Sequence, residues 1–140
     1  MISIVRRYLP RLSALPLAVL IVFASSLPSL ADQSKRVDAK TASKMIETGG
    51  IDMILDVRDI DEYTGPDGRI KGAQLVPLDK IPASMNKLAS FKDKTLLVYC
   101  AVGGRSNDAA RYLASKGFNN VFDLSGGIYA WKAAGLPVIK

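Results

Sequence analysis

The chain has 140 residues, which fits about one compact domain and excludes a multidomain assembly. It contains no histidine. This absence excludes Ser-His-Asp hydrolases, HExxH metalloproteases and most zinc or non-haem iron sites. A net charge of +6 is compatible with a nucleic-acid partner, so it matters where in the chain the basic residues lie.

The N-terminal segment has the layout of an export signal. Three arginines within the first 11 residues precede the apolar run ALPLAVLIVF over 14–23, and small residues at Ser29 and Ala31 suit a cleavage site. We predict that residues 1–31 are a cleaved signal peptide that directs the protein to the periplasm or outside the cell. The alternative is an uncleaved membrane anchor, since residues 12–31 carry no charge.

Most of the basic excess belongs to this segment. Cleavage after Ala31 removes three of the 19 basic residues and no acidic one, which leaves 16 against 13, or +3. We therefore expect no nucleic-acid partner, and membrane contact only through the N-terminal segment if it stays uncleaved.

The remaining chain alternates between predicted strands and helices. Residues 32–40 are polar and charged, so we interpret them as a linker that leads into a domain over 41–140. Apolar runs predict strands over 51–57, 95–99 and 121–124, with a brief apolar stretch at 73–78, and helical patterns cover 41–48, 81–90, 106–116 and 128–134. Such alternation predicts an α/β fold with a parallel sheet covered on both faces, which binds ligands beyond the carboxyl ends of its strands.

The one cysteine, Cys100, lies at such an end, directly after the strand over 95–99. It is either a small buried hydrophobe or a functional thiol. The loop CAVGGRS that follows can turn its backbone N–H groups inward and form an anion-binding nest. The next helix adds the positive end of its dipole, with Ser106 as a plausible N-cap, and Arg105 adds a full charge.

A thiol at the mouth of this nest gains nucleophilicity without imidazole, because the nest stabilises the thiolate. We predict Cys100 as the catalytic nucleophile, with no metal and no organic cofactor. The residues expected to bind a small anionic substrate are Ala101, Val102, Gly103, Gly104, Arg105 and Ser106.

Three segments carry further motifs. Leu96–Val138 contains the loop pattern Cys-x-x-Gly-x-Arg-Ser followed by GG, AW and GLPV, and upstream lie Leu55–Tyr63 (LDVRDIDEY) and Gly68–Leu78 (GRIKGAQLVPL). Together these segments resemble the single-domain rhodanese family, in the exported type similar to phage-shock protein E, and the two upstream segments resemble its DVR, EY and GHIxGA elements.

The resemblance implies a five-stranded parallel sheet and a sulfurtransferase. Cys100 would take a sulfane sulfur from thiosulfate or a similar donor as a persulfide and pass it to cyanide or a thiol. Asp56 and Arg58 match the DVR pair, which we expect to brace the neighbourhood of the loop. Arg69 stands where the family often has histidine, and could add charge near the loop.

Two other functions are compatible with the same loop. A cysteine phosphatase or an arsenate-reductase-like enzyme uses a similar nest, but such loops take Cys-x5-Arg, whereas Cys100 and Arg105 give the shorter Cys-x4-Arg. The second is a sulfane-sulfur carrier or binding module that loads sulfur but turns over poorly.

Overall fold

A computed structural model of the chain describes residues 34–140. The predicted signal peptide or anchor, residues 1–31, lies outside the described residues. Within the described range, none of the helices has the length and apolar character that crossing a membrane requires.

A five-stranded sheet forms the centre of the domain, and all of its neighbouring strands are parallel. The strands are β1 (Ser34–Val37), β2 (Met53–Asp56), β3 (Ala73–Leu75), β4 (Thr95–Tyr99) and β5 (Asn120–Leu124). Their spatial order is β1-β5-β4-β2-β3, so β4 lies in the middle. The predicted α/β fold with a parallel sheet of five strands is confirmed.

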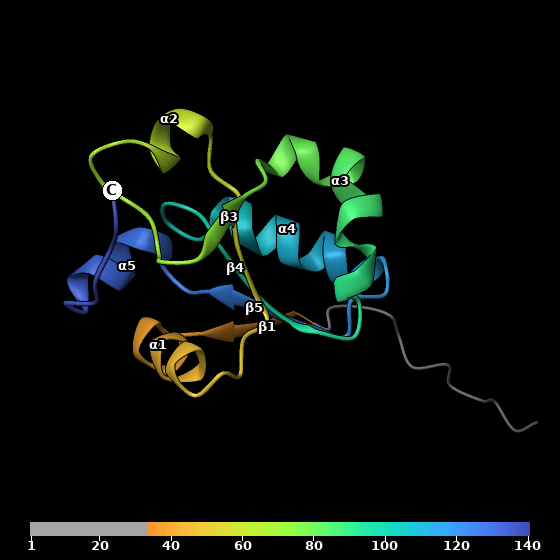
Figure 1. The fold of residues 1–140 in the computed structure, drawn as a ribbon, viewed down its shortest axis with the longest axis horizontal. Coiled ribbons are helices and arrows are strands. Elements are labelled where there is room, and N and C mark those ends of the chain that lie inside the picture. The colour runs from red at the N-terminus through yellow and green to blue at the C-terminus, as the bar shows by residue number, and fades with distance from the viewer. Residues whose placement is uncertain (1–33) are drawn as a thin grey trace, which may run out of the picture.

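Helices cover both faces of this sheet, as predicted (Figure 1). The α-helices are α1 (Ala39–Glu47), α2 (Ile60–Tyr63), α3 (Ile81–Leu88), α4 (Gly104–Ser115) and α5 (Gly127–Ala133), and the short 3-10 turns are η1 (Leu78–Lys80) and η2 (Ala89–Phe91). The helices α3 and α4 pack on one face, and α1 and α5 pack on the other.

The central strand β4 supplies side chains to both cores. Leu96 and Val98 pack toward α3 and α4, whereas Leu97 and Tyr99 point to the face covered by α1 and α5. All four are fully buried, which explains the continuous apolar run, because a central parallel strand is covered on both sides. Cys100 follows the strand and belongs to the core under α4.

The prediction of a linker over 32–40 is wrong for residues 34–37. These residues form β1, which pairs with β5 in the register Ser34 to Val121 and Val37 to Leu124. An edge strand is held by backbone hydrogen bonds on one side and can carry charged side chains, so β1 lacks the apolar run of an inner strand. Helix α1 then starts at Ala39, two residues earlier than expected, because the Asp38 carboxylate caps it.

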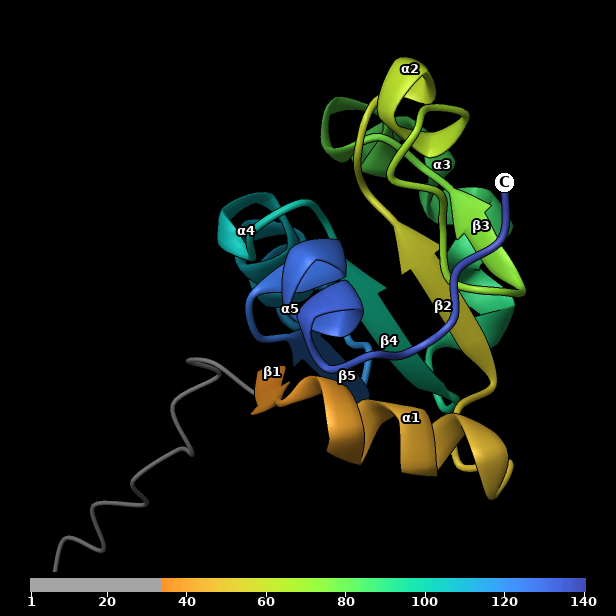
Figure 2. The ribbon, with the colours of Figure 1, turned by 90° about the vertical axis from the view of Figure 1, so that its left-hand side faces the viewer.

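Between β2 and β3, where the sequence pattern predicts neither a strand nor a helix, lies the short helix α2. Asp59 and Glu62 form a reciprocal capping box, in which Glu62 accepts from the backbone N–H of Asp59 at 3.1 Å. The last residues of the chain cross to this region and form an antiparallel bridge between Ile139 and Arg69 (Figure 2). The segment that carries α2 is therefore held at both of its ends.

The edge position of β1 gives a first prediction about stability. A chain that begins at Asp38 retains the α1 cap but loses the pairing with β5, so its free energy of unfolding should fall by about 2–4 kcal/mol, from several hydrogen bonds at about 1 kcal/mol each. Urea unfolding against a chain that begins at Gln33 measures the difference. Equal stability of the two chains would contradict a structural role for β1 and restore the linker interpretation.

Candidate active site

Cys100 lies at the carboxyl end of β4, beneath the N-terminus of α4, and is only 1% exposed. Its Sγ atom accepts hydrogen bonds from two backbone amides, that of Gly103 at 3.1 Å and that of Ser106 at 3.4 Å. Gly103 has a φ of +106° and precedes α4, a conformation that suits glycine and turns the amide inward. The sulfur thus sits where amides and helix dipole favour negative charge.

The N-terminus of α5 holds the other side of the loop. The amide of Ile128 donates to the carbonyl oxygen of Cys100 at 2.8 Å, and the amide of Tyr129 donates to that of Ala101 at 3.2 Å. Gly127 makes this approach possible, because a Cβ atom there would lie 2.4 Å from the Cys100 carbonyl oxygen. The loop carbonyls therefore point toward α5, which leaves loop amides free to face the sulfur.

The remaining loop residues occupy different environments. Val102 is 67% exposed and forms the outer rim of the loop. Gly104 is exposed and begins α4, with open space around its Cα. The backbone of this loop, more than its side chains, surrounds the sulfur, and contact of Ala101, Val102 and Gly104 with a substrate stays a prediction.

The Arg105 guanidinium is bound to Glu62 of α2 through both of its terminal nitrogens, at 2.7 and 2.8 Å. This pair lowers the pKa of the Glu62 carboxyl and raises that of Arg105. Asp59 adds a second carboxylate at 3.7 Å. Arg105 is therefore compensated by acidic groups, and its expected contact with an anionic donor stays a prediction.

Ser106 does not cap α4, contrary to expectation, because Gly103 already occupies that position and the helix begins at Gly104. Its fully buried hydroxyl instead donates to Asp123 at 2.6 Å, while the Cys100 thiol donates to Ser106 Oγ at 3.5 Å. Asp123 is fully buried on β5, and the Nε atom of Arg36 on β1 donates to its other oxygen at 3.1 Å.

Sequence reasoning missed Asp123 and Arg36. One signal was present, since Asp123 interrupts the apolar strand VFDL, and a carboxylate in a buried strand needs a hydrogen-bonding partner. Arg36 gave no such signal, because it lay in a segment interpreted as a linker.

Asp56 and Arg58 form a buried ion pair on the face of the sheet opposite to Cys100. The Nε and Nη2 atoms of Arg58 donate to the Asp56 carboxylate at 2.6 to 3.1 Å, and Nη2 also donates to the carbonyl oxygen of Gly68 at 2.8 Å. The guanidinium lies 5.5 Å from the ring centre of Tyr99, the residue before Cys100. The pair is in place to brace the strand that leads into the loop.

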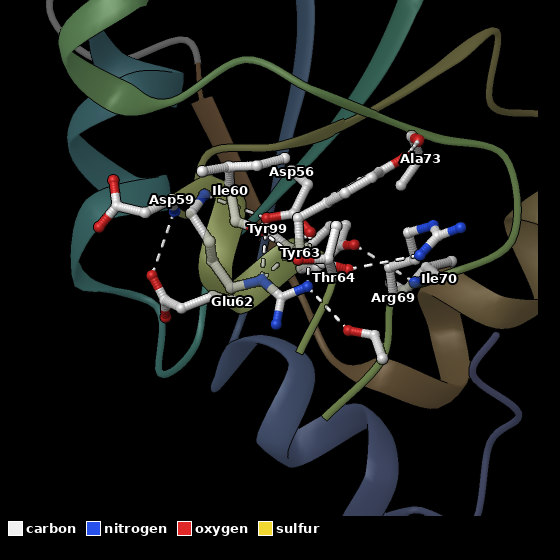
Figure 3. Close-up of polar contacts among 12 residues, drawn as sticks. Asp56, Asp59, Ile60, Glu62, Tyr63, Thr64, Arg69, Ile70, Ala73 and Tyr99 are labelled. Carbon is white, nitrogen blue, oxygen red and sulfur yellow. Dashed lines mark hydrogen bonds and ion pairs between the residues drawn. The ribbon is translucent and has the colours of Figure 1, made fainter. Parts of the chain in front are cut away.

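Arg69 turns toward α2. Its guanidinium lies 4.6 Å from the ring centre of Tyr63, and its Nη1 donates to the Tyr63 carbonyl oxygen at 3.4 Å (Figure 3). Tyr63 in turn donates its hydroxyl to the carbonyl oxygen of Ala73 at 2.9 Å. Arg69 thus has a structural role beside α2.

No group of three or more cysteine and acidic residues suited to a metal ion occurs in the part of the chain that the structure describes.

A parallel α/β domain in which a cysteine loop leads into the N-terminus of a helix belongs to a class of proteins that bind anions next to a cysteine thiol. The sequence profile of the Rhodanese-like domain matches residues 38–134, so the chain belongs to the rhodanese family. This membership and the relatives below support a sulfurtransferase.

Relatives of this chain carry names that agree with that family. A protein of Allochromatium vinosum named sulfurtransferase is 32% identical over 103 residues, which cover 74% of this chain and 92% of that protein. A Pseudomonas fluorescens protein named thiosulfate sulfurtransferase GlpE is 35% identical, over 70% and 84% of the two chains. The crystal structure of a rhodanese-like domain protein from Staphylococcus aureus has a TM-score of 0.62 at 30% identity, and covers 76% and 99%.

The close approach at Gly127 gives a prediction about the loop. Gly127→Ala puts a methyl group against two backbone carbonyls at a φ of +58°, so it should cost more than the roughly 1–2 kcal/mol of a left-handed alanine and should displace the loop. Gly49→Ala is a matched control, since its φ is +74° but nothing lies within 4 Å of the added atom. Thermal unfolding of both variants tests this, and equal losses would contradict the close contact.

The pair between Glu62 and Arg105 predicts a pH-dependent stability. Because the folded pKa of Glu62 lies below its ordinary 4.5, the stabilisation is present above that value and is lost as pH falls through the lowered pKa. Both side chains are about one-third exposed, so Glu62→Gln should lower stability at pH 7 by only about 0.2–1 kcal/mol.

Thermal unfolding at pH 7 and pH 3 measures this effect, and the difference between the variant and the parent should shrink at pH 3. Asp61→Asn on the same helix is the control, because Asp61 lies outside this pair. A difference that persists unchanged at pH 3 would mean that the ionised pair is not its source.

Proposed function

We propose that this protein is a sulfurtransferase in which Cys100 carries sulfur as a persulfide, from thiosulfate or a similar anionic donor to a thiol or cyanide acceptor. The observation that carries the proposal is the position of Cys100 Sγ, which accepts two backbone amides at the N-terminus of α4. Membership of the rhodanese family supports the same chemistry.

The proposed reaction has two displacements at sulfur. The Cys100 thiolate attacks the outer sulfur of thiosulfate, the S–S bond of the donor breaks, and sulfite leaves with the bonding electron pair. An acceptor thiolate or cyanide then attacks the outer sulfur of the persulfide, and the Cys100 thiolate leaves. The negative charge that the enzyme carries lies on a sulfur in both the thiolate and the persulfide, so fixed amides can stabilise each of these states as an oxyanion hole stabilises oxygen.

The state of Arg105 supports transfer of sulfur over phosphatase chemistry. A cysteine phosphatase needs a guanidinium fork turned toward its oxyanion. Both terminal nitrogens of Arg105 are bound to Glu62, and the loop is one residue shorter than a phosphatase loop. Arg105 in this proposal stabilises the loop through its ion pair with Glu62 of α2.

A sulfane-sulfur carrier with poor turnover is the second candidate, and the burial of Cys100 favours it. A sulfur that is 1% exposed restricts the approach of a large acceptor. Steady-state turnover of thiosulfate with cyanide, compared with the extent of persulfide loading, separates the enzyme from the carrier. Loading without turnover would favour the carrier.

The proposal predicts that Cys100→Ser abolishes sulfur uptake. Mass spectrometry after incubation with thiosulfate or 3-mercaptopyruvate should show one added sulfur on the parent protein and none on the variant, because a hydroxyl is a poor nucleophile toward sulfur.

A double variant tests the loop itself. Cys100→Ser with Ser115→Cys moves the thiol to the exposed end of α4, away from the two amides. It should not accumulate the persulfide. Uptake equal to that of the parent would show that any thiol suffices and would contradict the proposed role of the loop.

We further propose that the protein is exported and that its mature form begins near Asp32. The support is the order of arginines, apolar run and small residues before that position. N-terminal sequencing of the protein from its native host should find Asp32 first. An intact N-terminus in the membrane fraction would favour the anchor.

A further inference from the structure

Behind Cys100, away from the two amides, a chain of polar side chains runs through the core. The Cys100 thiol donates to Ser106 Oγ at 3.5 Å, Ser106 donates to Asp123 Oδ1 at 2.6 Å, and Arg36 Nε donates to Asp123 Oδ2 at 3.1 Å. Cys100, Ser106 and Asp123 are 0 to 1% exposed. The catalytic steps proposed above make no use of Ser106 Oγ or of Asp123.

The direction of the hydrogen bonds in this chain is fixed by chemistry. An ionised carboxylate can only accept, so the hydrogen of the Ser106 hydroxyl belongs to Asp123. The short, charge-assisted bond of 2.6 Å outcompetes a weaker one to a sulfur 3.5 Å away. Ser106 therefore turns a lone pair toward Cys100, and a lone pair stabilises the thiol and opposes the thiolate.

We propose that Asp123 is a positioning residue that holds the Ser106 hydroxyl in this orientation and thereby opposes ionisation of Cys100 in the resting protein. The inference rests on Cys100 being the reacting thiol of the proposed function. The amides of Gly103 and Ser106 favour the thiolate on one side of the sulfur, and the pair of Ser106 and Asp123 favours the thiol on the other. Their balance sets the fraction of reactive sulfur.

Loading with sulfur changes this balance. In the persulfide, Sγ is bonded on both sides and uncharged, and the negative charge sits on the outer sulfur. A Cys100 thiolate competes with Asp123 for the hydrogen of the Ser106 hydroxyl, whereas the uncharged inner sulfur of the persulfide does not. Asp123 thus opposes charge on the resting cysteine more than charge on its persulfide.

The other charged groups around the sulfur do not reverse this direction. On α4, Arg105 is compensated by Glu62 and Asp59 of the α2 segment. On β1, Arg36 faces Asp123 and is 60% exposed, so water screens its charge. Asp56 on β2 and Arg58, two residues after it, pair with each other on the opposite face of the sheet.

The test is the pH dependence of Cys100 alkylation by iodoacetamide, followed by mass spectrometry. In Asp123→Asn the amide oxygen should remain toward the donor Arg36, so the amide NH₂ faces Ser106 and frees its hydrogen for the sulfur. The apparent pKa of Cys100 should fall by about one unit, which is about tenfold in thiolate at low pH. The control Asp93→Asn removes an exposed carboxylate at a distant site and should leave this pKa unchanged.

Repeating the Asp123→Asn substitution in a Ser106→Ala protein separates the effect of the oriented hydroxyl on the Cys100 pKa from the effect of the Asp123 charge. In Ser106→Ala there is no hydroxyl to orient, so adding Asp123→Asn should shift the pKa by less than half of the shift seen with Ser106 present. An equal shift in both backgrounds would overturn the proposal, because it would reflect the carboxylate charge acting through space. An unchanged or raised pKa in Asp123→Asn would overturn it as well.

Arg36→Met keeps the proposal testable if Asp123→Asn fails to fold, since Arg36 is at the exposed edge. Loss of its charge strengthens the hold of Asp123 on Ser106, so the pKa of Cys100 should rise. Lys35→Met is the matched control, because Lys35 lies on the same strand but contacts Phe122. A pKa that falls or does not move in Arg36→Met would contradict the proposal. Alkylation needs no sulfur donor, so these outcomes are independent of whether the protein transfers sulfur.

Discussion

The hydrogen bond between the amide of Ile128 and the carbonyl oxygen of Cys100 is the contact on which the site depends. It turns the first loop carbonyl toward α5 and thereby lets later amides of the same loop face the sulfur. Only a residue without a side chain fits between the two segments, at Gly127. The orientation of the loop backbone around the thiol thus depends on the docking of a helix that contributes no side chain to the site.

Two further contacts complete the surroundings of the loop, one from a helix and one from a strand of the sheet. Glu62 reaches Arg105 from α2, beyond the β2 side, and Asp123 reaches Ser106 from β5. One contact compensates the positive charge of the loop at its surface, and the other places a negative charge beneath it. The potential at the sulfur is a balance of these groups with the amides, and a single group does not determine it.

Much of this arrangement could be predicted from sequence because it rests on local patterns. The apolar strand before Cys100, the two glycines after it and the helix that follows are adjacent in the chain, so their chemistry can be inferred together. The family resemblance supplied the number of strands.

The parts that could not be predicted depend on pairings between distant residues. Strand β1 has no apolar pattern, because it is an edge strand held mainly by backbone hydrogen bonds. Its partner β5 is also far away in the sequence, with a separation of 87 residues between Arg36 and Asp123. From the sequence, the Ser106 hydroxyl is most simply interpreted as a helix cap. Its hydrogen bond to Asp123 becomes visible only when the fold places β5 beside α4. Isolated charged residues carry no periodicity, so their partners emerge only once the sheet order is known.

The pairing of β1 with β5 also bears on the order of folding. Contacts between distant segments form late, because closing a long loop costs entropy before any contact compensates it. Without β1, strand β5 would be the edge of the sheet, and the carboxylate of Asp123 would lack the cation that β1 supplies. Docking buries the carboxylate and delivers Arg36 to it in the same event. Among the strand pairs of the sheet, the pair with the longest separation in sequence is thus the one that brings the cation which the buried acid beneath the cysteine requires.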